Sequence, residues 1–407
     1  MDSSMLGSYG TWIEDLESAR RRDFSFLDDH WNDVAAWSVE ARRLFSAFVL
    51  SQDLGTPRAE ITARRTIGDL DGGSDLTVEE LAWRLPYGPP TRAIFLKPAH
   101  ATERLPAVLA LHDHGANKYF GKRKIADADE TVHPHVRQYR ELYYGGRAWA
   151  NELARRGYAV LVPDVFPFES RKILASELPG FVVERMMQDP DELRELTPES
   201  AAIGGKCTTY DVFGEEPSDS IDRYNAFASQ HESIVAKSLF CAGLSWPGVA
   251  LSEDRAALDY LASRPDVDPE RIGCGGFSGG GLRTNYLAGS DPRVRCSVTT
   301  GFMTTWADFA LNSSHTHTWM LYIPGLSARM DLPDILAMRS PLPTLVQATT
   351  EDPLFTRGLV EKAGEILEAS WRKAGSADRF RMAWHKGPHR FDLAMQEEAF
   401  DWFDRWL

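Results

Sequence analysis

Residues 271–281 read RIGCGGFSGGG, in which six glycines surround a single serine, Ser278. Three interpretations compete: a phosphate-binding loop, a flexible linker, or a sharp turn that presents Ser278 as a nucleophile. A Walker-type loop needs a Lys-Ser/Thr pair after its glycines, and no such pair follows at the right spacing. A dinucleotide fingerprint needs a third glycine where this chain has Ser278. A linker is disfavoured because segments typical of buried elements flank both sides.

The third interpretation agrees with residues 276–280, GFSGG, which match the pattern G-x-S-x-G. A strand-like segment precedes this pattern and the helix-like residues 282–289 follow it, which is the context that the motif requires. In such a turn the residues two before and two after the serine pass close together, so side chains there would clash. The N-terminus of the following helix favours a developing negative charge. The sequence therefore predicts a nucleophile at Ser278.

A serine hydroxyl needs a base that takes its proton, and the base needs an acid that orients it. In hydrolases with this turn, the acid and then the histidine follow the serine along the chain. Asp352 lies in LVQATTEDPLF (345–355), directly after a strand-like segment. His389 lies in WHKGPHRFD (384–392), before the last expected helix. We therefore predict a catalytic triad of Ser278, Asp352 and His389.

Other residues near these positions could also serve as acid or base. His385 directly continues the last expected strand, so we expect it to be a wall residue and prefer His389. Glu351 neighbours Asp352, but the proline after Asp352 stiffens the turn and favours the aspartate. Asp308, which follows the preceding strand, is a third candidate for the acid.

An oxyanion hole needs two backbone N–H groups that point at the developing negative charge. Gly279, directly after the serine, is expected to supply one of them. The second should come from the loop after the third expected strand, which reads LHDHGANKYFGKRK, and we propose His114 or Gly115. We interpret His112 in the same loop as a structural hydrogen-bonding residue.

The remaining chain alternates strands and helices, which predicts an α/β fold with a mostly parallel central sheet and helices on both faces. Expected strands lie at 76–85, 91–99, 105–111, 158–165, 271–276, 294–302, 343–350 and 379–387, and expected helices at 146–157, 248–264, 282–289, 359–375 and 393–407. We expect residues 76–407 to form the catalytic domain, with lid or binding-loop insertions at about 168–243 and 304–340. Residues 1–75 are expected to form an N-terminal cap or dimer segment, helical to about residue 70, which leaves a homo-oligomer open.

Four motifs together resemble the α/β-hydrolase superfamily from about residue 80 onward: LHDHG (111–115), VDPERIGCGGFSGGG (267–281), EDPLF (351–355) and GPHRF (387–391). The combination is similar to the dienelactone hydrolase and acetyl xylan esterase-like branch. Prolyl oligopeptidase catalytic domains share the pattern DPxRIGxxGxSxGG, which lies within residues 267–281. The resemblance implies a serine–aspartate–histidine triad, no metal and no organic cofactor. Asp113 stands where the family commonly has a glycine after histidine. Position 278 is serine, so the cysteine-based lactone chemistry of dienelactone hydrolase is not expected.

Composition narrows the classes of partner. The chain has 407 residues and a formal net charge of −14, which disfavours nucleic acid because an acidic protein repels phosphate backbones. The four cysteines are widely spaced without a C-x-x-C pair, which suits a reducing compartment. We see no signal peptide and no apolar run of about 18 residues, so we expect a cytoplasmic protein that does not bind membranes.

These observations predict a serine esterase that cleaves a small or medium carboxylic ester without a cofactor. A peptidase or amidase of the prolyl oligopeptidase kind is the first alternative. A metal-dependent hydrolase is the second, because three H-x-H pairs occur: His112 and His114, His133 and His135, and His315 and His317. No acidic cluster accompanies those pairs at metal-binding spacing. A non-catalytic binding protein on the same fold is the third alternative.

Overall fold

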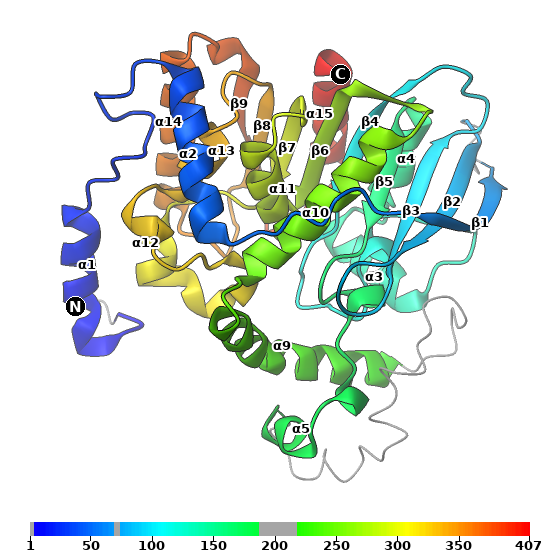
Figure 1. Cartoon of the computed structure of the whole chain (residues 1–407), viewed down its shortest axis with the longest axis horizontal. Coiled ribbons are helices and arrows are strands. Elements are labelled where there is room, and N and C mark those ends of the chain that lie inside the picture. Colours follow the sequence, from blue (N-terminus) through cyan, green and yellow to red (C-terminus); the bar gives the residue numbers. More distant parts are fainter. Residues whose placement is uncertain (1–3, 69–73, 187–217) are drawn as a thin grey trace.

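The structure, a computed structural model, describes residues 4–68, 74–186 and 218–407 (Figure 1). A nine-stranded sheet forms the centre of this described part, in the order β1-β2-β3-β5-β4-β6-β7-β8-β9. The strands are β1 Glu60–Ile67, β2 Leu76–Trp83, β3 Thr91–Pro98, β4 Leu105–Leu111, β5 Ala159–Pro163, β6 Val267–Phe277, β7 Cys296–Thr300, β8 Thr344–Thr349 and β9 Phe380–His385. From β5 to β9 all neighbouring strands are parallel, whereas β1, β2 and β3 join the edge in antiparallel pairs. The predicted mostly parallel sheet is therefore confirmed.

Helices cover both faces of the sheet (Figure 1). One face packs against α2 Val34–Val49, α10 Trp246–Ser263, α11 Gly279–Ser290, α13 Leu332–Ala337 and α14 Arg357–Lys373. The other face packs against α3 Pro134–Tyr143, α4 Trp149–Arg155 and α15 Leu393–Trp406. Strands β4, β5, β7 and β8 are largely or wholly buried because helices lie on both sides of them, and β4 and β5 are also almost wholly apolar.

The N-terminal segment is helical only in part. Its helices are α1 Gly10–Ala19 and α2, and residues 60–67 form the edge strand β1 instead of the expected helix. The reason is pairing: β1 runs antiparallel to β2, and the carboxylate of Glu79 on β2 accepts hydrogen bonds from Arg64 on β1. The expectation of a helical segment to about residue 70 is therefore wrong for β1, which belongs to the central sheet.

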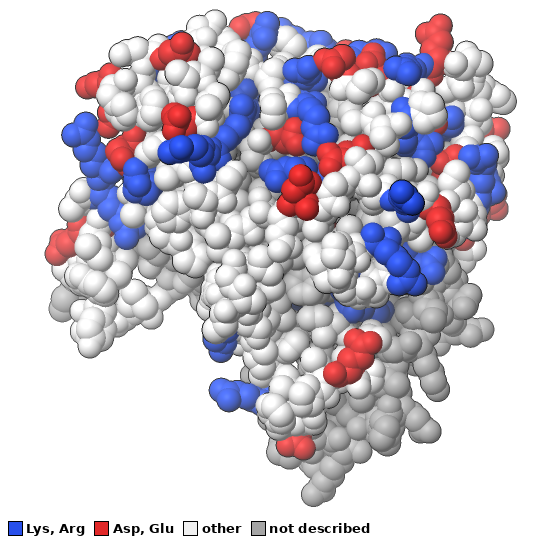
Figure 2. Space-filling model, in the orientation of Figure 1, with Lys and Arg blue, Asp and Glu red and all other residues white. Residues whose placement is uncertain are grey.

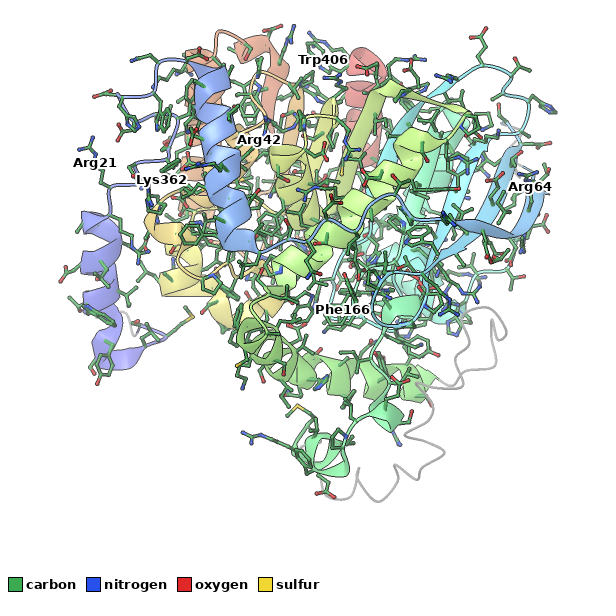
Figure 3. The ribbon with its side chains drawn as sticks, viewed as in Figure 1. Arg21, Arg42, Arg64, Phe166, Lys362 and Trp406 are labelled. Carbon is green, nitrogen blue, oxygen red and sulfur yellow. The ribbon has the colours of Figure 1, made fainter. Side chains whose placement is uncertain are left out.

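Helix α2 is anchored on the helices that cover one face of the sheet. Its buried apolar side chains recur at every fourth residue: Trp37, Ala41, Phe45 and Val49. Full burial of each large apolar side chain contributes about 1.5–3 kcal/mol. Arg42 lies on the same helix (Figure 3). It donates hydrogen bonds to the carbonyl oxygens of Gly289, at 3.0 Å, and Met338, at 2.8 Å. The helix therefore packs firmly against α11 and the end of α13.

Both expected insertions interrupt the alternation of strands and helices. The first contains α5 Gly180–Met186 and α9 Ser218–Cys241, which lie together beyond the sheet at one end of the molecule (Figure 1), while its residues 187–217 lie outside the described residues. The second contains α12 Trp306–Asp308, a series of short turns and α13. None of the described helices is by itself long and apolar enough to span a membrane. One bent pair, α9 with α10, has the required length and apolar composition only when the two helices are taken together.

Charged side chains of both signs are interspersed on the face shown in Figure 2, without a broad region of one sign. Of the four cysteines, Cys274 and Cys296 are buried free thiols and Cys241 is an exposed one, whereas Cys207 lies outside the described residues.

Candidate active site

Ser278 occupies a sharp turn between β6 and α11. Its backbone has φ 53° and ψ −121°, a region that residues with side chains rarely adopt. The N–H of Ser278 donates to the carbonyl oxygen of Thr300 on β7 at 2.8 Å, and its own carbonyl accepts from Leu282 in α11 at 2.9 Å. Hydrogen bonds to two elements thus hold the strained backbone.

The glycines around the serine allow this turn to pass close to β4. A Cβ added to Gly280 would lie 2.0 Å from the carbonyl oxygen of Leu111, and one added to Gly276 would lie 2.5 Å from the same atom. Strands β4 and β6 are parallel neighbours, and their paired ends, Leu111 and Gly276, bring the turn against the loop after β4. The prediction that Gly276 and Gly280 make room for the bend is confirmed.

The structure brings Asp352 and His389 together, although 37 positions separate them in sequence. His389 Nδ1 lies 2.7 Å from Asp352 Oδ2, and the other carboxylate oxygen of Asp352 accepts the N–H of Leu354 at 3.0 Å. An ionised carboxylate only accepts hydrogen bonds, so Nδ1 carries the proton and Nε2 presents a lone pair. That arrangement suits His389 to accept a proton from a hydroxyl group.

The other candidates for acid and base, His385, Asp308 and Glu351, either bind other residues or are exposed to solvent. His385 Nε2 lies 2.8 Å from a carboxylate oxygen of Glu398 on α15. Asp308 is buried, and one of its carboxylate oxygens accepts the N–H of Thr356 at 3.0 Å. The side chain of Glu351 is exposed. Of the acids and bases considered from the sequence, the pair that forms beside Ser278 is therefore Asp352 and His389.

A cavity of about 260 Å³ lies over the serine turn. Its lining includes Ser278, Gly279 and His389, the loop residues Asp113 to Ala116, the rings of Tyr139, Tyr143, Phe277, Phe302 and Phe355, and Thr316 to Thr318 with Leu354. In this structure no hydrogen bond joins the Ser278 hydroxyl to His389 Nε2, which has no partner among the described residues. Such bonds are often long in ligand-free sites and tighten when substrate binds.

The loop after β4 lies directly against the N-terminus of α11. A Cβ added to Gly279 would lie 2.7 Å from the backbone nitrogen of His114, and its three nearest atoms all belong to His114. Of the two residues that the sequence offered, His114 is thus the one that contacts Gly279. In the described part of the chain, no group accepts a hydrogen bond from the N–H of either His114 or Gly279. Gly115 has φ 51°, and a Cβ there would overlap the hydroxyl of Tyr139.

Asp113, the departure from the family pattern, is buried at the centre of a polar network behind this loop. Its carboxylate accepts hydrogen bonds from the hydroxyls of Tyr139 and Tyr144 and from Lys124 Nζ at 3.3 Å. Lys124 Nζ also donates to the carbonyl oxygens of Asp113, at 2.8 Å, and His114, at 3.0 Å. Burial raises the pKa of both tyrosines well above 10, so they stay protonated donors. The network therefore fixes the backbone of the loop.

We expect Asp113→Ala to lower the free energy of unfolding by about 3–5 kcal/mol, because it leaves the buried Lys124 ammonium without its carboxylate. Urea unfolding followed by circular dichroism measures this loss. Asp15→Ala, which removes an exposed carboxylate from α1, is the matched control and should change stability by less than about 0.5 kcal/mol. Equal stability of the two variants would show that the network does not hold the loop.

The three H-x-H pairs do not form a metal-binding cluster with other described residues. No group of three or more His, Cys, Asp or Glu side chains suited to a metal occurs in the described ranges. His112 is buried with its Nδ1 3.0 Å from the carbonyl oxygen of Asp113, which agrees with a structural role. His133 Nδ1 accepts the N–H of His135 at 3.1 Å, and His317 lines the cavity.

Comparisons with known proteins agree with this architecture. Residues 242–353, which include Ser278 and Asp352, match the family model of the prolyl oligopeptidase family. The fold is similar to the crystal structure of a "putative acetyl xylan esterase" from Bacteroides fragilis, with a TM-score of 0.65, 15% identity, and coverage of 94% of this chain and 83% of that one. The chain has the α/β-hydrolase fold.

Two further proteins are similar to this chain. A glucuronoyl esterase from Solibacter usitatus superposes with a TM-score of 0.57 at 14% identity, covering 95% of this chain and 99% of the esterase. "Putative hydrolase YtaP" of Bacillus subtilis is 24% identical over 319 residues, which are 77% of this chain and 83% of that protein. These matches confirm the superfamily resemblance stated from the sequence.

Proposed function

We propose that this α/β-hydrolase is a serine esterase that cleaves a small or medium carboxylic ester through an acyl-enzyme. The observation that carries the proposal is the convergence of three groups on one cavity. Ser278 lies in a strained turn, His389 is oriented by Asp352, and the N–H of His114 lies against Gly279. The esterase names of the structural neighbours support the same chemistry.

In the first half-reaction, the Ser278 oxygen attacks the ester carbonyl carbon while His389 Nε2 takes the hydroxyl proton. The carbonyl oxygen becomes an oxyanion, and the N–H groups of His114 and Gly279 stabilise it. Asp352 stabilises the imidazolium that forms. When the tetrahedral intermediate collapses, the bond to the alcohol oxygen breaks and His389 returns the proton to the leaving alcohol.

In the second half-reaction, water attacks the acyl group on Ser278 while His389 again accepts a proton. A second tetrahedral intermediate uses the same two N–H groups. Its collapse releases the carboxylic acid and returns the proton to the Ser278 oxygen. The aromatic lining of the cavity suits an apolar group on the acyl or alcohol side.

A panel of p-nitrophenyl esters from acetate to octanoate tests the proposal. We expect turnover that is highest for the shorter acyl chains, because the cavity has a volume of about 260 Å³. The panel should give the same rates after exhaustive dialysis against EDTA, which addresses the metal-dependent alternative. Loss of all turnover on chelation, or tight ester binding without turnover, would contradict the proposal.

A peptidase or amidase is the second candidate, and one observation favours it: the matched family model is that of the prolyl oligopeptidase family. That match covers the serine and the acid, but not the loop after β4 or His389. Matched substrates decide between the two. p-Nitrophenyl butyrate and p-nitrobutyranilide differ only in the scissile bond, and we expect turnover of the ester alone. Hydrolysis of the anilide or of a proline-containing peptide at a comparable kcat/KM would favour the peptidase.

A further inference from the structure

Glu232 on α9 joins three segments that are far apart in sequence. One of its carboxylate oxygens lies 2.7 Å from His114 Nε2 and 2.6 Å from Lys118 Nζ, both in the loop after β4. The other oxygen accepts the backbone N–H of Trp319 at 3.0 Å. The first insertion carries Glu232 and the second carries Trp319. Both insertions therefore meet the loop of the proposed oxyanion hole at one buried carboxylate.

The hydrogen bonds of His114 define its protonation. The N–H of Ala116 donates to His114 Nδ1 at 3.1 Å, so Nδ1 has no proton and Nε2 carries one. The Nε2–H is then donated to Glu232. Burial and the nearby Lys118 lower the pKa of His114, so the ring stays neutral. Burial alone would raise the pKa of Glu232, but His114 and Lys118 hold it well below its usual range. The contact is thus a neutral imidazole donating to a carboxylate.

This contact acts on a residue whose backbone matters for catalysis. The backbone nitrogen of His114 lies against Gly279. The Asp113 network binds the carbonyl oxygens of Asp113 and His114 through Lys124, but it does not hold the His114 side chain. Oxyanion donors act only when they lie about 2.7–3.1 Å from the position of the developing charge. The side-chain anchor on α9 supplies the second point that fixes the orientation of the His114 peptide group.

We propose that Glu232 is a positioning residue that holds the backbone N–H of His114 in line with that of Gly279. The proposal rests on the proposed esterase function and deepens it. It assigns to the insertion helix α9 a part in stabilising the oxyanion. Because Glu232 does not line the cavity, its effect is on the transition state and not on substrate binding.

The test measures kcat and KM of Glu232→Ala and Glu232→Gln with a short p-nitrophenyl ester. Loss of one oxyanion donor typically lowers kcat by about 10²–10³. For a displaced donor we expect Glu232→Ala to lower kcat about 10- to 100-fold, with KM within about threefold. Glu232→Gln should lose less, because its amide oxygen can still accept the proton of His114 Nε2. The inhibition constant of an alkyl boronic acid should rise in parallel with the fall in kcat.

A double-mutant cycle with His114→Ala shows whether Glu232 acts through that side chain. If it does, Glu232→Ala should change kcat little once His114 is already alanine. Gln230→Ala, an exposed position on the same helix, is the matched control and should keep full kcat. Lys118→Met combined with Glu232→Leu removes both buried charges together with the acceptor of His114 Nε2. This double variant keeps the test valid if Glu232→Ala unfolds the protein.

The outcomes separate this proposal from the proposed function. If Ser278→Ala is inactive but folded Glu232 variants keep kcat and boronic acid affinity, the esterase stands and the positioning role is overturned. An equal loss on Glu232→Ala in both His114 backgrounds would also overturn it. If Ser278→Ala keeps full ester turnover, the proposed function itself fails.

Discussion

Replacing Ser278 with alanine should lower kcat for ester hydrolysis by about 10⁴–10⁶-fold, the range typical of a lost triad serine. The proposed reaction forms its covalent bond at the Ser278 oxygen, and alanine has no atom that can take that place. The fold should persist, because alanine can occupy φ 53° as serine does and the backbone N–H still donates to Thr300. Stopped-assay kinetics with a p-nitrophenyl ester and a thermal melt measure the two quantities.

A control variant shows whether removing any serine hydroxyl at an end of α11 lowers activity. Ser290→Ala alters the last residue of the same helix, where the hydroxyl donates only to backbone carbonyls. It should retain kcat within about twofold, because Ser290 lies at the opposite end of α11 from Ser278 and does not line the cavity. Ester turnover by folded Ser278→Ala at the rate of the unaltered protein would remove Ser278 from the mechanism.

Asp352→Asn should lower kcat by about 10⁴-fold, as expected when the acid of a triad becomes an amide. The amide can donate its N–H to His389 Nδ1, which would leave the imidazole proton on Nε2. A protonated Nε2 cannot accept the hydroxyl proton of Ser278. The charge that stabilises the imidazolium is also lost. Steady-state kinetics between pH 6 and 10 measure the effect on kcat and on kcat/KM.

The chain offers two matched controls for the acid. Glu351→Gln removes the adjacent, exposed carboxylate, and Asp308→Asn removes the buried carboxylate that binds the N–H of Thr356. Both variants should keep most of the activity, provided that Asp308→Asn folds. A larger loss of kcat in either folded control than in Asp352→Asn would move the acid to that residue.

The fold could be predicted largely because buried parallel strands have a local signature. Strands such as β4 and β5 are continuous apolar runs bounded by helices, and the serine turn has its own pattern of glycines. Strand β1 was missed for the opposite reason. Its residues EITARRTI are mostly exposed at the edge of the sheet, and only the pairing with β2 makes them a strand.

Some residues of the candidate site could likewise be predicted from local sequence, and others could not. Ser278, Asp352 and His389 each follow a strand, so sequence order alone could propose them. The roles of Asp113 and Glu232 depend on contacts between distant segments. Asp113 meets Tyr144 across 31 positions, and Glu232 meets His114 across 118. Nothing local to those residues signals such partners, and a buried carboxylate was not expected in a loop that commonly carries glycine.

Covalent labelling tests the central claim most directly. The intact protein is treated with a fluorophosphonate, digested, and analysed by mass spectrometry. We expect one phosphonyl adduct on the Ser278 oxygen, loss of ester turnover in proportion to labelling, and no adduct on Ser278→Ala or on protein unfolded beforehand. An adduct on a different residue, or full ester turnover after complete labelling of Ser278, would contradict that claim.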